Sequence, residues 1–231
     1  AGTENGIYLS TDFGNSWESL YSDLMIIPTS ITFKGKDTAL IFAIQGQSAG
    51  RIFATYDGFK TTTILHESNS TYGYSCNPKG DLILFTNLTG ELFRSEDFGK
   101  TYTADTYFGS DKNGRINMIK QINGKVFVTT QDGKLIVSND SADSWESLSV
   151  PGISNYYFRS MDIDSEGNYY LTVTTDTDGK VLKSSNLIDW EIIASVNYSI
   201  NNVVAVSPNK IIFGGAKGGI WVAERTSAIN E

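Results

Sequence analysis

Short runs of alternating apolar and polar residues follow one another along the whole chain, and turn residues separate them. Residues 116–148 show one unit: I-N-M-I-K-Q, an Asn-Gly turn, K-V-F-V-T-T, an Asp-Gly turn, K-L-I-V-S, a polar turn and S-W-E-S-L. Period-two alternation, β-branched residues and such turns are typical of β-strands joined as hairpins. No segment keeps a helical apolar period, so we expect almost no helix.

The same unit recurs through the chain. The Ser or Thr that ends the third strand falls at positions 10, 55, 95, 138 and 184, in steps of 45, 40, 43 and 46 residues. Aligning the units gives five first, five second, six third and five fourth strands. A repeat of this length in an all-β chain predicts one domain over 1–231, a β-propeller of four-stranded antiparallel blades.

The number of blades depends on how the ends of the chain pair. Five blades follow if the N-terminal hairpin completes a sheet begun by residues 201–207 and 210–214. Such closure would remove exposed sheet edges. The surplus third strand leaves six blades as the alternative.

A short phrase follows the third strand in five of the units, and we call each copy a box. It reads S-T-D-F-G-N-S-W at Ser10–Trp17, S-E-D-F-G-K-T-Y at Ser95–Tyr102 and S-N-D-S-A-D-S-W at Ser138–Trp145. Weaker copies start at Thr55, without the aromatic residue, and at Ser184, where the phrase is one residue shorter.

Each residue type in the box has a structural role in a hairpin. Carboxylate, amide and hydroxyl groups can hydrogen-bond the backbone of their own turn. We expect this of Ser10, Ser95, Ser138 and Ser184, and of Asp12, Asp57, Asp97, Asp140 and Asn186. Gly14 and Gly99 allow a positive φ. The closing aromatic residues should be buried between neighbouring sheets; they are Trp17, Tyr102, Trp145 and Trp190.

These residues resemble the Asp box, or bacterial neuraminidase repeat, with the pattern S-x-D-x-G-x-x-W. The resemblance implies a β-propeller, as in sialidases, endoglucanases acting on xyloglucan, sortilin-type receptors and photosystem assembly factors. It also implies that the box lies at the blade periphery, away from any catalytic centre. We therefore interpret the box carboxylates as structural and assign no catalytic residue.

Composition excludes several functional classes. The net charge of −8 argues against general nucleic-acid binding, which needs clustered Lys and Arg. One cysteine, Cys76, and one histidine, His66, exclude an intrachain disulfide and a His-rich metal site, so we expect no metal and no cofactor. No apolar run is long enough to span a membrane. The chain starts without Met, and we expect a secreted or extracytoplasmic bacterial protein.

The resemblance to sialidases and endoglucanases raises the possibility that the protein hydrolyses glycans. Sialidases need three converging arginines, and this chain has five arginines in all, of which Arg159 lies in Y-Y-F-R-S-M-D without the R-I-P marker. This argues against a sialidase. A glycosidase with two carboxylates stays open, with these candidates: Asp162, Asp164, Glu67, Asp105, Asp111, Asp176 and Asp178. Solvated turn carboxylates are the favoured interpretation of each.

Propellers commonly bind ligands on the face formed by the connections from fourth to first and from second to third strands. In this chain, aromatic and cationic residues gather in the connections from fourth to first strands. Such side chains can stack on sugars or anchor a protein. The candidate binding residues are Tyr107, Phe108, Arg115, Tyr156, Arg159 and Tyr198.

The leading functional hypothesis is therefore a non-catalytic module that recognises a glycan or a protein on this loop face. The alternatives are a glycoside hydrolase, or a fragment of one, and an assembly factor that docks on a partner protein.

Overall fold

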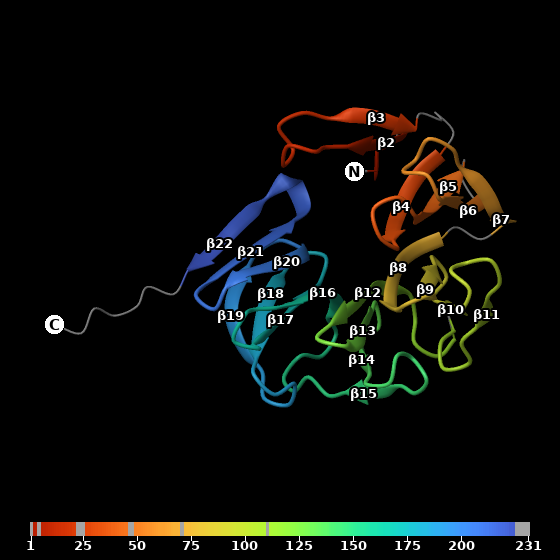
Figure 1. Ribbon diagram of the computed structural model, residues 1–231. Coiled ribbons are helices and arrows are strands. Elements are labelled where there is room, and N and C mark those ends of the chain that lie inside the picture. The colour runs from red at the N-terminus through yellow and green to blue at the C-terminus, as the bar shows by residue number, and fades with distance from the viewer. Residues whose placement is uncertain are drawn as a thin grey trace. The chain divides into compact units, whose positions relative to one another are not determined.

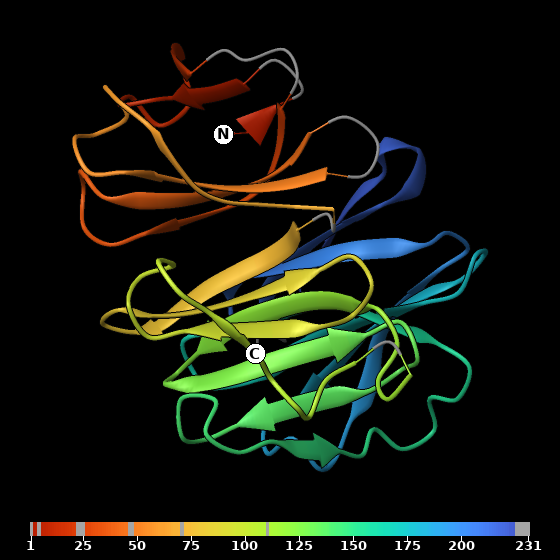
Figure 2. The same cartoon turned by 90° about the vertical axis from the view of Figure 1, so that its right-hand side faces the viewer.

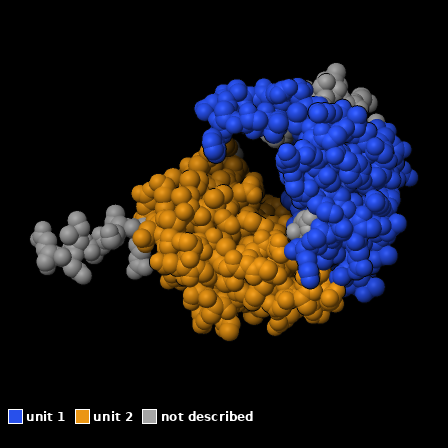
Figure 3. All heavy atoms as spheres, viewed as in Figure 1, with its two compact units in different colours: residues 1–112 blue, residues 113–231 orange. Residues whose placement is uncertain are grey.

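The computed structural model describes residues 2–3, 6–21, 26–45, 49–69, 72–109 and 111–224. The chain forms two compact units, residues 1–112 and 113–231, coloured separately in Figure 3. Their described residues form 22 strands and one 3₁₀ turn, Ala216–Gly218, which confirms the all-β prediction (Figure 1). The expectation of a single domain over 1–231 stays a prediction.

The first unit contains three antiparallel sheets, each a meander along the chain. Its strands are β1 (Gly2–Thr3), β2 (Gly6–Leu9) and β3 (Glu18–Tyr21); β4 (Ile26–Phe33), β5 (Ala39–Gln45), β6 (Ala49–Thr55) and β7 (Thr63–Ser68); and β8 (Tyr72–Lys79), β9 (Leu82–Asn87), β10 (Leu92–Ser95) and β11 (Thr103–Ala104).

The second unit also contains three antiparallel meanders. They comprise β12 (Ile116–Ile122), β13 (Lys125–Thr130), β14 (Leu135–Ser138) and β15 (Glu146–Leu148); β16 (Tyr157–Ile163), β17 (Tyr169–Thr174), β18 (Gly179–Ser184) and β19 (Glu191–Val196); and β20 (Ile200–Ser207), β21 (Lys210–Gly215) and β22 (Ile220–Glu224). Figure 2 shows the green strands of the first of these sheets side by side.

The predicted strand types are all present, with one addition at the N-terminus. The short strand β1 pairs with β2 through Gly2–Ile7 and Thr3–Gly6, a pairing that the alternation pattern did not indicate. In the predicted five-blade closure, this edge of β2 would pair with β21. Here β1 occupies that edge, and β21 is paired on both sides, with β20 and β22. The predicted pairing of the N-terminal hairpin with β20 and β21 is therefore not seen among the described residues, which form six sheets. The number of blades stays a prediction.

The core of each unit lies between consecutive sheets. Phe42 on β5 meets Phe85 on β9 with ring centroids 5.0 Å apart, and Tyr72 packs edge-on against both rings. In the second unit one apolar cluster joins β12–β15 to β16–β19, and another joins β16–β19 to β20–β22. Strand alternation produces these layers because successive side chains point to opposite faces, and each face is apolar.

Candidate functional site

The box carboxylates bind their own hairpins. The Asp12 carboxylate accepts hydrogen bonds from the Ser10 hydroxyl (2.8 Å), the Ser16 backbone N–H (2.9 Å) and the Ser16 hydroxyl (2.6 Å). These bonds, the Ser16 hydroxyl first, lower the pKa of Asp12 to about 2. Ser144 and Ser138 lower the pKa of Asp140 to about 2 in the same way. A carboxylate this acidic is a poor proton donor near neutral pH.

A hydroxyl residue six positions after the first Ser or Thr completes the box. Its backbone N–H and its hydroxyl bind the two oxygens of the same carboxylate in all four copies that contain Asp; the residues are Ser16, Thr61, Thr101 and Ser144. The sequence interpretation gave this column no role, although the aligned phrases display it.

The box aromatic residues are not buried equally, which corrects the expectation for Trp17. Tyr102 packs into the core of its unit, with ring centroids 5.1 Å from Phe85 and 4.7 Å from His66. Trp190 packs against the cluster between β12–β15 and β16–β19, and Trp145 is half-buried. Trp17 is 53% exposed and bonds its own hairpin through Nε1 to the Gly14 carbonyl (3.1 Å).

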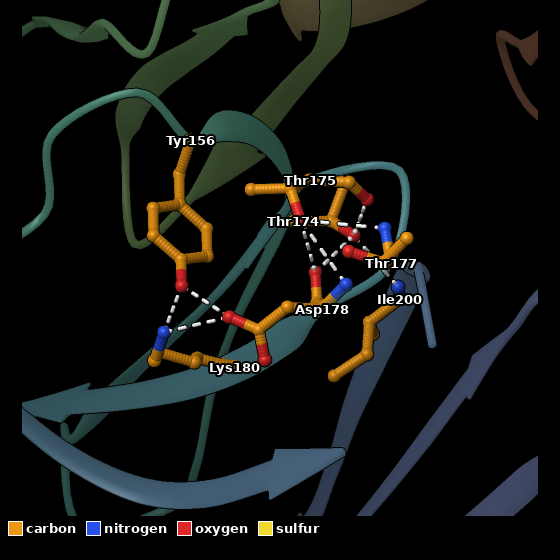
Figure 4. A network of polar contacts seen from close by, with 7 residues as sticks. All are labelled: Tyr156, Thr174, Thr175, Thr177, Asp178, Lys180 and Ile200. Atoms are coloured by element: carbon orange, nitrogen blue, oxygen red, sulfur yellow. Dashed lines mark hydrogen bonds and ion pairs between the residues drawn. The ribbon is translucent and has the colours of Figure 1, made fainter. Parts of the chain in front are cut away.

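A polar cluster lies on the loop face of the second unit, where β17 ends and β18 begins. Lys180 Nζ lies 2.7 Å from Asp178 Oδ2 and 4.1 Å from the centre of the Tyr156 ring. The Tyr156 hydroxyl contacts both charged groups (Figure 4). The Lys180 ammonium lowers the pKa of Asp178, and the Asp178 carboxylate raises the pKa of Lys180, so both are charged near neutral pH.

Threonines tie this cluster to the next sheet. The Thr174 hydroxyl donates to the Asp178 carbonyl (3.0 Å) and accepts the Ile200 backbone N–H (3.2 Å) (Figure 4). The Thr175 hydroxyl accepts the Asp178 N–H at 3.0 Å. The short loop between β17 and β18 is therefore fixed to the start of β20.

Two further candidate residues belong to the same unit. Arg159, at the start of β16, lies 5.6 Å from the Tyr157 ring and donates from Nη1 to Asn117 Oδ1 (3.3 Å). Its Nε is buried without a hydrogen-bond partner among the described residues. Tyr198 is 44% exposed, and its ring stacks on Trp221 with centroids 6.4 Å apart.

The three remaining candidate binding residues divide between the two units. Arg115 is exposed just before β12 in the second unit. Tyr107 and Phe108 belong to the first unit and pack edge to face, with centroids 5.2 Å apart. Phe108 is only 5% exposed, which corrects its selection as a surface contact: an aromatic residue in a loop fills the core as readily as it meets a ligand.

Three further candidate glycosidase carboxylates have structural partners. Asp162 pairs with Lys120 on β12 (2.7 Å) and accepts the Ala205 N–H on β20 (2.9 Å), so it links three first strands. Asp164 is buried, which opposes ionisation, but hydrogen bonds from Asn168 and Tyr170 outweigh burial and lower its pKa. Glu67 pairs with Arg51 at 2.8 Å.

Within the described residues, no group of three or more His, Cys, Asp or Glu side chains is placed to hold a metal ion. Nor does any described helix have the length and apolarity needed to cross a membrane.

Comparison with known proteins gives similarity at the level of fold. No family model and no curated protein sequence matches the chain. A solved structure of YCF48 bound to D1 peptide matches with a TM-score of 0.67 and 15% identity over 95% of this chain and 73% of that chain. YCF48 from Cyanidioschyzon merolae matches with a TM-score of 0.62 and 16% identity, covering 90% of this chain and 69% of that chain.

A GH74 xyloglucanase from Xanthomonas campestris is also similar, with a TM-score of 0.74 and 14% identity. The match covers 97% of this chain but only 41% of the xyloglucanase. These neighbours are β-propellers, so the likeness supports the predicted architecture. They include YCF48 and a xyloglucanase, and identity this low shows the fold alone.

Proposed function

We propose that the chain is a non-catalytic recognition module that binds a segment of a partner protein on the loop face of its second unit. The observation that carries this proposal is the set of tyrosine rings held in place on that face, two of them beside cations. Tyr156 lies against Lys180, Tyr157 lies beside Arg159, and Tyr198 is exposed over a tryptophan. Tyrosine and arginine held in place by neighbours are typical anchors of protein interfaces.

The fixed geometry of this face favours binding. Hydrogen bonds from Thr174 and Thr175 hold the loop before Lys180, so little side-chain or loop entropy is lost when a partner docks. Arg159, a half-buried residue, adds a cation beside the Tyr157 ring that a carboxylate of the partner would pair with.

Two observations favour a protein segment over a hydrolysed glycan. The carboxylates Asp162, Asp164 and Asp178 already accept hydrogen bonds or pair with lysine, and the lowered pKa values of Asp164 and Asp178 do not suit a general acid. The fold is also similar to YCF48, one structure of which contains a bound D1 peptide. A glycan partner is the alternative, supported by the similarity to a xyloglucanase.

The proposal is tested by screening the protein against an array of short peptides and an array of glycans, with mass spectrometry of every bound sugar. Binding to peptides that is weakened by Tyr198→Ala, and not by Tyr56→Ala in the first unit, supports it. Tyr56 is a matched control because its ring is also about half exposed. Hydrolysis of a bound glycan would contradict it.

A further inference from the structure

A cavity of about 420 Å³ lies in the second unit between its last two sheets, β16–β19 and β20–β22. One wall includes Tyr170 near the start of β17 and Lys183 near the end of β18. The other wall includes the turn Pro208–Asn209 and Ile211 near the start of β21. The loop face lies at the opposite ends of these strands, where β17 ends and β18 begins, so the cavity is separate from the site of the proposed function. Its volume suits a small molecule.

Tyr170 occupies a position that, in two other sheets, is packed with a box residue. Leu40 and Phe127 are its equivalents in the sheets β4–β7 and β12–β15, because each pairs with the penultimate residue of the third strand, as Tyr170 does. Phe98, from the box of the sheet that follows β4–β7, is buried in the same apolar cluster as Leu40. Leu187, from the box of the sheet that follows β12–β15, is buried in the same cluster as Phe127. An apolar box side chain therefore helps to fill the space between these consecutive sheets.

The last sheet supplies no such side chain among its described residues. The apolar cluster around Tyr170 consists of strand residues, among them Ile211 and Phe213. The third strand β22 ends at Glu224, and the sequence that follows it, R-T-S-A-I-N-E, contains neither the aspartate nor the aromatic residue of a box. The cavity therefore lies beside a position that is packed with an aromatic or aliphatic box residue in the other sheets.

A half-buried lysine at this cavity has no anionic partner within the described part of the chain. Lys183 Nζ lies 5.7 Å from the centre of the Tyr170 ring and makes no hydrogen bond or ion pair there. The Tyr170 hydroxyl is not its anion, because burial and the hydrogen bond that this hydroxyl donates to Asp164 (2.8 Å) raise the pKa of Tyr170. Glu191 is the register partner of Lys183 on β19, but its side chain is exposed and forms no ion pair with Lys183. Lys183 is therefore available to an anion in the cavity.

We propose that the cavity binds a small aromatic carboxylic acid, whose ring takes the place of the missing box side chain and whose carboxylate pairs with Lys183. An aromatic ring fits between consecutive sheets of this chain, because Phe98 is buried with Leu40 at the equivalent position. A partly desolvated ammonium forms a strong, charge-assisted hydrogen bond with a carboxylate. Lys210, the second lysine of the cavity, is already paired with Glu224. The inference does not involve the loop face and stands apart from the proposed function.

The test is a titration of the full chain with phenylacetate, followed by two-dimensional NMR spectroscopy of the backbone amides. Saturable shifts should appear at the amides of Lys183, Ile211 and Ala223, which line the cavity, with a dissociation constant of about 1 mM. Phenylacetamide has the same shape without the charge and should bind at least about tenfold more weakly. Absence of saturable shifts at these amides, or equal affinity for the acid and the amide, would overturn the proposal.

Lys183→Met removes the ammonium and keeps an unbranched side chain, and it should weaken the binding of phenylacetate at least about tenfold. Lys125→Met is the matched control: Lys125 is also a half-buried lysine on a strand of the second unit, and this variant should bind as the wild type does. Thermal melts confirm that each variant is folded. A Lys183→Met protein that binds phenylacetate as tightly as the wild type would overturn the assignment of the carboxylate to Lys183.

Discussion

At the scale of single residues, the box carboxylate acts as a hydrogen-bond acceptor for its own hairpin. Asp12 and Asp140 each bind two hydroxyls and a backbone N–H, and this holds their pKa values near 2. The same bonds occur around Asp57 and Asp97, whose pKa values are also lowered. The four carboxylates have the same environment and therefore the same structural role.

The lowered pKa values predict acid sensitivity. A carboxylate whose pKa is lower in the folded than in the unfolded chain contributes stability above its unfolded pKa of about 4, and this is lost as the pH falls toward its folded value. We expect the melting temperature to drop between about pH 4 and pH 2. Asp140→Asn should lower the melting temperature at pH 7 and make the drop shallower.

Thermal melts over a pH series check this, with Asp176→Asn as the control because Asp176 lies in a loop outside every box. An Asp140→Asn protein with the same pH profile as the wild type would show that the box carboxylate does not supply this stability.

The aromatic residues of the boxes differ in burial, so replacing them with alanine should lower the free energy of unfolding by different amounts. Tyr102→Ala removes a ring packed against Phe85, Phe93 and His66 and should cost about 3 kcal/mol in the free energy of unfolding. Trp17→Ala should cost less than about 1 kcal/mol, because that side chain is largely exposed. Urea unfolding of both variants measures the difference, and equal costs would contradict it.

At the scale of elements, most of the predicted strands were found from their turn residues and from the alternation of apolar and polar positions. Asn123 and Gly124 both have positive φ in the turn between β12 and β13, as an Asn-Gly turn requires. The boundaries of the second strands follow the alternation pattern closely. The strand β1 was missed because a pair of Gly2 and Thr3 carries no alternation, and its pairing depends on the neighbouring edge of β2.

The loop between β17 and β18 depends on a buried hydroxyl. Thr174→Val keeps the shape of the side chain but leaves the Ile200 N–H without its partner, and should cost about 1–3 kcal/mol in stability. Faster hydrogen exchange at the Ile200 amide should accompany the loss. Thr177→Val, at an exposed position of the same loop, serves as the control. Unchanged exchange at Ile200 would mean that this bond does not fix the loop.

At the scale of the whole molecule, the sequence predicted the repeat, whereas the contacts around the candidate residues could be described only from the structure. Arg115, Tyr156, Arg159 and Tyr198 belong to one unit, as loops at the same end of consecutive sheets should. The partners Asp178 and Lys180 were not foreseen as a group with Tyr156. Asp178 lies in a second-to-third connection and Lys180 on the strand that follows it, and contacts between segments of different hairpins leave no periodic signal in a sequence.

The fold alone does not select a function, because similar folds occur in YCF48 and in xyloglucanases. In this chain, the loop face of the second unit combines engaged carboxylates with aromatic rings beside cations. That combination is the basis of the recognition function proposed above.

The measurement that tests this account most directly is isothermal titration of the strongest array peptide into the wild type and into Arg159→Ala, Tyr198→Ala and Tyr56→Ala. We predict that the first two variants weaken binding by about 2 kcal/mol, roughly thirtyfold, with melting temperatures close to the wild type. Tyr56→Ala should bind as the wild type does. Equal affinity for all four proteins would contradict the assignment of binding to the loop face of the second unit.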